Sequence, residues 1–333
     1  MIIVTGGAGF IGSSIIRALN ERGRSDIIVV DNLKNIQKSN NLKNCNIYSY
    51  VDKDCFFEWI HHRKSLQKSI EVVFHEGACS DTTNNNIRHM IYNNFQYSKC
   101  ILEFCLNNSI QLVYASSASV YGTGRQGFRE DNISETPLNI YAYSKYLFDL
   151  YVQKFLPNTK SQIVGLRYFN VYGPRESHKG VMASLAYQFD RQLKHNGIIK
   201  PFKGIQGVAD GEQRRDFVYI DDIVDVTLWF YENSHISGIF NVGTGQSRSV
   251  NDIAHLVMEF HGYGAIDYIS FPKYLIGHYQ IFTESDNSYL LSQGWNKPFL
   301  NIEEGIGKYL ELINNESFEY AFRKIEEEPA NVA

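Results

Sequence analysis

The sequence predicts an α/β protein with a doubly wound parallel sheet and a second, smaller α/β domain. Short apolar runs such as Ile2-Ile3-Val4 alternate with longer amphipathic stretches through the first half of the chain. This alternation is typical of a parallel sheet that is covered by helices on both faces. The alternation ends after Pro174, where the chain becomes richer in Gly, Lys and Gln. A length of 333 residues is sufficient for two domains.

The individual elements are predicted from the spacing of their apolar residues. One helix is expected from about Gly12 to Arg22, and a second from Tyr143 to Leu156, where Pro157 ends the helical pattern. β-branched and aromatic runs predict strands at 2–4, 27–30, 72–74, 112–115 and 163–166, and strand-like segments return at 217–220 and 239–242. The chain is therefore expected to cross back to the first sheet after it enters the second domain.

The charge balance and the cysteines argue against several classes of protein. The chain carries 32 Lys and Arg against 36 Asp and Glu, a net charge of −4, whereas a nucleic-acid binder normally has a basic excess. Its five cysteines form no Cys-x-x-Cys pair, so neither a disulfide framework nor a metal site is expected. No apolar run approaches the roughly 20 residues that cross a bilayer. We expect a cytoplasmic protein that has neither a nucleic-acid nor a membrane partner.

Three glycines indicate a dinucleotide-binding turn. Gly6, Gly9 and Gly12 directly follow the first expected strand and open the first expected helix. Glycines at this spacing let the backbone contact a pyrophosphate, and the helix amino terminus offers N–H groups to that anion. Asp31 follows the second strand, 19 residues after Gly12, where an acidic residue binds ribose hydroxyls. Together these features favour a Rossmann dinucleotide site over a glycine-rich loop without a ligand.

The residues near Asp31 leave the choice between NAD and NADP open. Asp31 by itself favours NAD, whereas the 2′-phosphate of NADP requires a nearby cation. Lys34 and Lys38 lie in the loop after Asp31, and Lys53 follows the third strand. Each of these lysines could also be an ordinary solvated residue.

A tyrosine and a lysine one helical turn apart form the candidate catalytic pair. Tyr141 and Lys145 should lie on one face of the helix, because i and i+4 residues are neighbours there. A lysine cation is expected to lower the pKa of the phenol, and a shift from about 10 to about 7 corresponds to roughly 4 kcal/mol. Ser117, at the carboxyl end of the strand 112–115, could hold the reacting oxygen beside Tyr141. Alone, Tyr-x-x-x-Lys is a common helical pattern and Ser117 could merely cap a strand.

The chain resembles the extended short-chain dehydrogenase/reductases, which mostly act on nucleotide-diphosphate sugars. The motifs that carry the resemblance are the glycine turn, Ser117 before Val120-Tyr121-Gly122, the Tyr141 and Lys145 pair, and the segments 167–175, 215–222 and 241–245. The match extends to about residue 313. We expect residues 1–172, with a return at 216–245, to form the Rossmann domain. Residues 173–215 and 246–313 are expected to form the substrate-binding domain, and 314–333 a charged tail.

Closer features are similar to the group within this family that inverts C6 of an ADP-bound heptose for the lipopolysaccharide core. The main one is the segment 173–180, which reads Gly-Pro-Arg-Glu-x-His-Lys-Gly. This resemblance implies a tightly bound NADP, a homo-oligomer (a pentamer) and two proton-transfer groups, Tyr141 and Lys179. Judged by its own residue type, Lys179 could instead bind phosphate or lie in solvent.

The resemblance also assigns binding roles by position. The implied cofactor contacts are Phe10, Ile11, Asp31, Asn32, Lys38, Lys53, Glu76, Gly77, Ala78, Cys79, Ser80, Asn93, Lys145, Val171 and Lys179. The implied substrate contacts are Asn170, Val181, Gln188, Phe202, Lys203, Gly204, Arg215 and Tyr279. Val181 and Gln188 depart from the usual serine and histidine of the group, and the segment 205–214 is several residues longer than usual.

Other functions on the same scaffold make different demands on the sequence. A 4,6-dehydratase needs an acid just after the serine strand, and the stretch 117–120 contains none. A non-catalytic dinucleotide-binding protein would be expected to lack Tyr141 or Lys145, and both are present. A UDP-hexose 4-epimerase is harder to exclude and is the main alternative.

Overall fold

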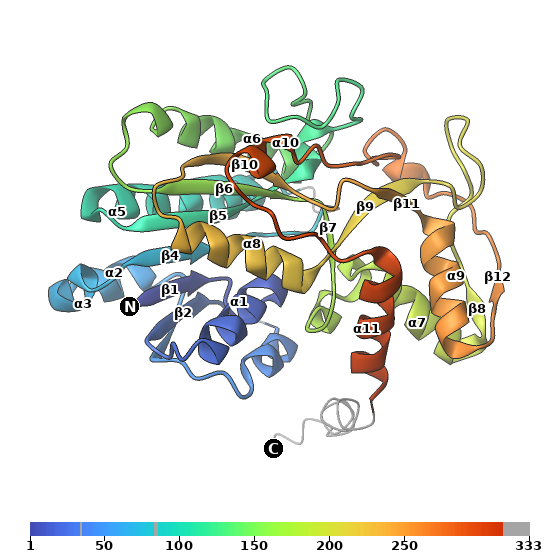
Figure 1. Ribbon diagram of the computed structural model, residues 1–333, viewed down its shortest axis with the longest axis horizontal. Coiled ribbons are helices and arrows are strands. Elements are labelled where there is room, and N and C mark those ends of the chain that lie inside the picture. The colour runs from blue at the N-terminus through green and yellow to red at the C-terminus, as the bar shows by residue number, and fades with distance from the viewer. Residues whose placement is uncertain (34, 83–85, 316–333) are drawn as a thin grey trace.

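A seven-stranded parallel sheet forms the centre of the computed structural model, which describes residues 1–33, 35–82 and 86–315 (Figure 1). The strand order is β10-β6-β5-β4-β1-β2-β3, and every neighbouring pair is parallel. The strands are β1 (Ile2–Thr5), β2 (Ile27–Asp31), β3 (Ser49–Asp52), β4 (Val72–His75), β5 (Gln111–Ser117), β6 (Ile163–Tyr168) and β10 (Gly238–Val242). The predicted doubly wound α/β fold is confirmed.

Both faces of this sheet are buried, which explains why its strands are continuously apolar. Ile2 and Val4 pack in one cluster with α1 (Phe10–Glu21) and α8 (Ile220–Glu232). Ile3 points to the other face, and its cluster includes residues of the helices α2 (Phe56–His61), α5 (Tyr97–Asn108) and α6 (Ile140–Gln153). The short helices α3 (Lys64–Lys68) and α4 (Ile87–Ile91) complete this half.

Helix α6 begins three residues before the predicted start at Tyr143. Its first turn is capped by Asn139, whose side chain accepts a hydrogen bond from the Ala142 N–H at 2.9 Å. An asparagine is among the strongest N-caps. The cap therefore places Tyr141 inside the first turn of the helix and Lys145 one turn later.

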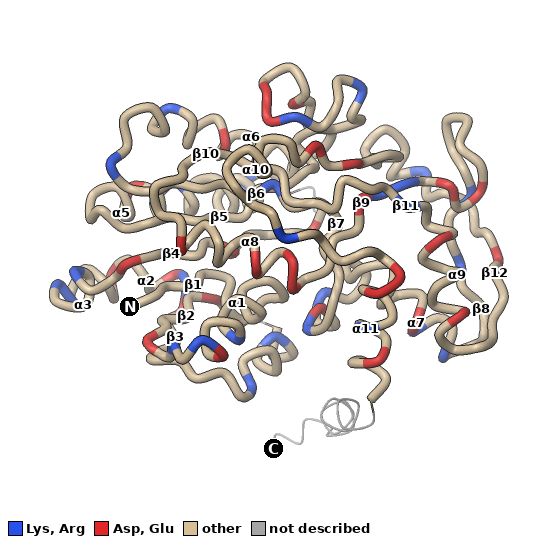
Figure 2. Tube along the Cα trace, in the orientation of Figure 1, with Lys and Arg blue, Asp and Glu red and all other residues tan. Residues whose placement is uncertain are grey.

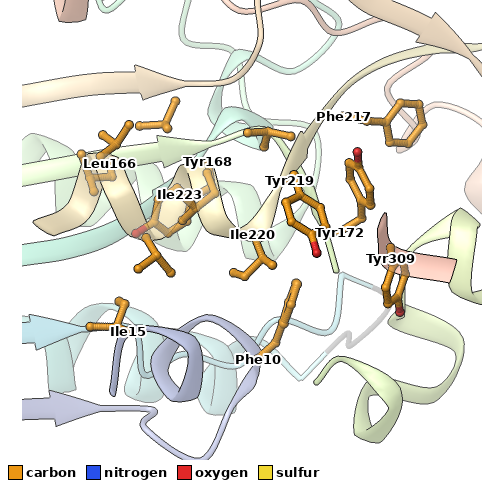
Figure 3. Packing of buried hydrophobic residues seen from close by; sticks show 14 of the residues in the cluster. Phe10, Ile15, Leu166, Tyr168, Tyr172, Phe217, Tyr219, Ile220, Ile223 and Tyr309 are labelled. Carbon is orange, nitrogen blue, oxygen red and sulfur yellow. The ribbon is translucent and has the colours of Figure 1, made fainter. Parts of the chain in front are cut away.

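Most of the remaining elements form a smaller body beside the sheet (Figure 1). A three-stranded sheet joins β7 (Asn170–Tyr172), β9 (Arg214–Tyr219) and β11 (Ser247–Ser249), and a short pair joins β8 (Ile198–Ile199) to β12 (Ala265–Ile266). Helix α9 (Val250–His261) packs between α7 (Leu185–Asn196) and α11 (Ile302–Asn314), and α10 (Ser288–Ser292) packs against β10. Figure 3 shows Tyr172 and Tyr219 beside Tyr309 of α11.

Two sequence expectations need comment. The strand predicted at 217–220 begins earlier, at Arg214, and ends at Tyr219, because Ile220 already starts α8 with two acidic residues in its first turn. Lys34 and the tail residues 316–333 lie outside the described residues.

In Figure 2, Lys and Arg are interspersed with Asp and Glu along the trace. No helix of the described ranges has the length and apolarity that a bilayer span requires.

Candidate active site

A cleft of about 1220 Å³ lies at the carboxyl ends of the central strands, where open α/β sheets bind ligands. Its volume exceeds the roughly 300–1,000 Å³ of a pocket for one small ligand. The candidate cofactor residues on its wall are Gly6, Gly9, Phe10, Ile11, Gly12, Asp31, Asn32, Lys38, Lys53, Glu76, Gly77, Ala78, Cys79, Ser80, Asn93, Lys145, Val171 and Lys179. Tyr141, Ser117, Asn170, Val181, Arg215 and Tyr279 line the same cleft.

The glycine turn at one end has the geometry of an anion site. Gly6 has φ +64°, and a Cβ there would lie 2.7 Å from the Gly77 nitrogen. A Cβ on Gly12 would lie 2.3 Å from the Gly6 oxygen. Among the described residues, no side chain caps α1 at its N-cap Gly9, so the first-turn N–H groups are available to a phosphate. The turn thus fits the pyrophosphate of a dinucleotide.

Asp31 is buried at the end of β2 and is paired with a lysine. Its carboxylate accepts hydrogen bonds from the N–H groups of Ala8 and Asn32, at 2.9 and 2.7 Å. The Lys38 ammonium lies 2.5 Å from the same carboxylate. The end of β2 therefore presents a neutralised pair rather than an isolated negative charge.

The candidate catalytic pair lies at the end of β5. The Lys145 ammonium donates to the Ala115 carbonyl at 2.8 Å, and burial lowers its pKa to about 8, although the charges of Glu76 and Asp149 act to raise it. Burial raises the pKa of Tyr141, and a hydrogen bond with Ser117 only partly opposes this. Among the protein's own groups desolvation is the larger effect, so the pKa of Tyr141 lies above its ordinary value rather than shifted toward 7.

The two adjacent serines of β5 have different partners. Ser116 donates to Asp149 of α6 at 2.8 Å and is buried. Ser117 interacts with Tyr141 and also accepts a hydrogen bond from the Ser119 hydroxyl at 2.9 Å. Ser116 thus anchors the helix α6, whereas Ser117 contacts the Tyr141 hydroxyl.

Sequence reasoning missed Asn94, which holds the loop after β4 against α6. Asn94 is fully buried in a π-helical turn, Tyr92–Gln96, between α4 and α5. Its side chain accepts from the Cys79 N–H at 2.7 Å, and donates to the Cys79 carbonyl and the Ser144 hydroxyl, both at 3.0 Å. The sequence signal for this role is weak, because Asn94 stands on a face that also holds the buried Ser98 one turn later.

Glu76 also differs from an ordinary surface carboxylate. The Tyr168 hydroxyl donates to one carboxyl oxygen at 3.2 Å, while the other oxygen is buried with no hydrogen-bond partner in the described part of the chain. Burial raises the pKa of Glu76 to about 7, and Lys145 acts in the opposite direction. Near neutral pH this carboxyl is therefore divided between its protonated and ionised forms.

Lys179 enters the cleft from a second loop, the 3-10 turn Ser177–Met182. Its ammonium lies 3.9 Å from the Glu176 carboxylate and 5.3 Å from the centre of the Phe10 ring. Burial lowers the pKa of Lys179, and Glu176 raises it. The neighbouring His178 has its pKa lowered to about 4 by burial and by the charges of Lys38 and Lys179.

Only part of the implied substrate set reaches the cleft. Arg215 is buried and its guanidinium stacks 4.6 Å above the Tyr279 ring, an arrangement that suits a diphosphate. Four of the predicted residues do not line the cleft as far as the chain is described, namely Gln188, Phe202, Lys203 and Gly204. Gln188 instead donates to the Ala183 carbonyl at 2.7 Å, and Phe202 packs on Phe271, which in turn packs on Tyr279.

Comparison with known proteins gives consistent matches over most of the chain. The chain is 50% identical over 313 residues to the ADP-L-glycero-D-manno-heptose-6-epimerase of Alkalilimnicola ehrlichii, covering 94% of this chain and 97% of that protein. The structure matches the Helicobacter pylori ADP-L-glycero-D-manno-heptose-6-epimerase with a TM-score of 0.81, 30% identity and coverage of 94% and 96%. It matches the Thermotoga maritima UDP-glucose 4-epimerase with a TM-score of 0.78, 28% identity and coverage of 98% and 99%.

The match to a family model includes the glycine turn, Asp31, and the Tyr141 and Lys145 pair. It spans residues 2–243, nearly three quarters of the chain, and the family is described as nicotinamide-dependent. Together with the cleft and the 50% identical relative, this shows that the chain belongs to the NAD dependent epimerase/dehydratase family.

Proposed function

We propose that this protein converts ADP-D-glycero-D-manno-heptose to ADP-L-glycero-D-manno-heptose by inversion at C6, a step in the formation of the lipopolysaccharide core precursor. The observation that carries the proposal is the meeting of two proton-transfer groups, Tyr141 from α6 and Lys179 from the loop 177–182, in one cleft. The 50% identical heptose epimerase supports the choice of sugar.

The chemistry explains why a dehydrogenase scaffold suits an epimerase. The C6–H bond of the sugar is not acidic, so inversion proceeds through oxidation to a 6-ketone and reduction from the other face. NADP, when bound, supplies the hydride acceptor and returns the hydride. In one orientation of the sugar, Ser117 holds the C6 hydroxyl and Tyr141 accepts its proton. The charge of Lys145 favours the ionised form of the Tyr141 phenol.

The returning step needs a proton on the opposite face, and Lys179 can supply it. Partial burial keeps its pKa below that of a solvated lysine, so it can release the proton that the alkoxide requires. One turnover leaves a proton on Tyr141 and removes one from Lys179. The two groups must therefore re-equilibrate, directly or through water, before the next turnover in the same direction.

We propose NADP rather than NAD as the cofactor. Lys38 neutralises Asp31 at 2.5 Å, and Lys53 lines the same part of the cleft. A 2′-phosphate requires a cation near the ribose-binding acid, which this pair provides. We also propose a pentamer, a cytoplasmic location and a division into two domains. Light scattering of the purified protein measures the number of subunits.

The direct experiment uses purified protein and ADP-D-glycero-D-manno-heptose, with the C6 epimer followed by NMR. Conversion is expected, with no deuterium at C6 when the reaction is run in D2O, because the hydride stays on the cofactor. Conversion of UDP-glucose but not of the heptose would replace the proposal with a 4-epimerase. Deuterium at C6 would contradict the transfer of hydride.

The roles of the two proton-transfer groups are tested by substitution. Tyr141→Phe and Lys179→Met are each expected to lower kcat by roughly 10²–10⁴-fold, the usual contribution of a general acid or base. The double variant is expected to retain bound NADP, measured by the absorbance of the released cofactor, and to show no epimerisation. Normal turnover by the double variant would rule out the two-group mechanism.

A further inference from the structure

The loop that carries Lys179 is organised around one buried carboxylate, Glu176. This side chain has no exposed surface, although it lies in a loop between β7 and α7. Buried carboxylates are rare unless their oxygens accept several hydrogen bonds. The partners of Glu176 therefore indicate what holds it in the interior.

The donors to Glu176 come from both ends of the loop and from the C-terminal helix. The Ser184 N–H and hydroxyl donate at 2.7 and 2.6 Å, and the Gly173 N–H approaches at 3.4 Å. Tyr309 of α11 donates from its hydroxyl at 3.0 Å, and Figure 3 shows its ring next to that of Tyr172, with 6.3 Å between the centres. One carboxylate thus ties residues before and after Lys179 to a helix more than 120 positions later in the chain.

Glu176 also faces the ammonium of Lys179. The Lys179 N–H donates to the Glu176 carbonyl at 2.9 Å, and the two charged groups are 3.9 Å apart. The ammonium also faces the Phe10 ring of α1, and its charge acts on His178, which is adjacent in the loop. Glu176 is the charged group that acts on Lys179 with favourable sign.

We propose that Glu176 is the positioning residue of Lys179, which it holds at the cleft through the loop and keeps charged through its own carboxylate. The inference rests on the proposed function in that Lys179 is taken as a proton-transfer group. Gly180, the next residue, has φ +55°, and the loop carbonyls on either side accept hydrogen bonds from Asn35 and Gln188, but the charged contact to Lys179 comes from Glu176.

The test measures the charge of Lys179 directly. Lysines are dimethylated with ¹³C-formaldehyde, and the Lys179 resonance is assigned by its loss in Lys179→Met. In Glu176→Gln the pKa of this resonance is expected to fall by about one pH unit, because an opposite charge at this distance has been removed. Tyr309→Phe, which removes a donor but keeps the charge, is the matched control and is expected to leave it within a few tenths of a unit.

Epimerisation provides the second readout. In Glu176→Gln, kcat is expected to fall at least tenfold with KM for the heptose changed less than twofold, and the alkaline limb of the pH profile should move to lower pH, because Lys179 must be protonated to donate. Should Glu176→Gln not fold, Glu176→Asp is used, with a smaller shift of the same sign expected. A Lys179 pKa that is unchanged, or equally changed in Tyr309→Phe, overturns the proposal.

The two readouts separate this inference from the proposed function. If the heptose is not converted but the Lys179 resonance shifts as expected, Glu176 still positions Lys179 and the assigned reaction is wrong. If the heptose is converted and the resonance does not shift, the reaction stands and the role of Glu176 is purely structural.

Discussion

Burial dominates the titration of individual side chains in this cleft. It raises the pKa of Tyr141, lowers that of Lys145 to about 8 and raises that of Glu76 to about 7. Each of these shifts favours a neutral side chain. The ionised phenol that the reaction needs must therefore be stabilised by positive charge near the hydroxyl, and Lys145 and an oxidised nicotinamide are its sources.

Glu76 gives a prediction for stability against pH. Its folded pKa of about 7 lies above the ordinary value of 4.5, so between these pH values the folded state holds a proton that the unfolded state has lost. The free energy of unfolding is therefore expected to fall between pH 4.5 and 7 because of this group. Between pH 5 and pH 8, the free energy of unfolding measured in urea should fall less in Glu76→Gln than in the wild type. An equal loss in both proteins would show that Glu76 titrates normally.

Lys38 gives a prediction for cofactor selectivity. Lys38→Ala is expected to weaken NADP binding about tenfold, or about 1.4 kcal/mol, and to change NAD binding far less, because only NADP carries the 2′-phosphate. The measurement is calorimetric titration with both dinucleotides. Lys43→Ala, at an exposed lysine of the same segment, is the control. If the binding of both dinucleotides were weakened equally, Lys38 would not be the residue that binds the 2′-phosphate.

Among the elements, α6 is fixed to the sheet by a buried ionic network. Arg167 of β6 is fully buried, and its guanidinium donates to Asp149 of α6 at 3.0 Å and to Glu135. Tyr114 and Ser116 of β5 donate to the same Asp149 carboxylate, at 3.0 and 2.8 Å. Because Asp149 follows Lys145 by one helical turn, the network also fixes the end of α6 that carries Tyr141 and Lys145.

Removal of the cation from this network should be strongly destabilising. Arg167→Leu leaves two buried carboxylates without their partner, which typically costs about 3–5 kcal/mol of unfolding free energy. Arg129→Ala breaks an ion pair with Asp286 in which the arginine side chain is 66% exposed, and should cost below about 1 kcal/mol. Urea denaturation compares the two variants. Similar costs would mean that the buried network contributes no more than a surface pair.

The sequence predicted the strands of the central sheet better than the helices. Continuous apolar runs identify β1, β2, β4, β5, β6 and β10, because such strands are buried on both faces. The start of α6 was placed too late, since its first turn depends on the Asn139 cap rather than on apolar spacing. The short strands β8 and β12 have two residues each, so neither carries a detectable period.

On the scale of the whole molecule, the cofactor half of the cleft was predictable and the substrate half was not. The glycine turn and Asp31 can be recognised from short stretches of sequence, because each lies at the end of a buried strand. Contacts such as those of Asn94 with Cys79 and of Glu176 with Tyr309 join distant segments and leave no local pattern. The resemblance supplied Phe202 and Lys203, but the packing of Phe202 on Phe271 sets its position beyond the cleft wall.

Because both sheets contribute to the cleft, cofactor binding should stabilise the molecule as one unit. At an NADP concentration of 100 Kd the free energy of unfolding should rise by about 2.7 kcal/mol. Calorimetry is expected to show one transition that moves to higher temperature. Two transitions, of which only one moves, would indicate that the smaller body unfolds independently.

The position of β10 at the edge of the central sheet has a consequence for synthesis on the ribosome. This strand pairs with β6 but is formed by residues 238–242, about 70 residues after β6 ends. Until those residues emerge, the nascent chain carries β6 with one unpaired edge, and unpaired edges favour association between chains. The nascent chain should therefore depend most on chaperones while translation pauses before residue 242, when the edge of β6 is still unpaired.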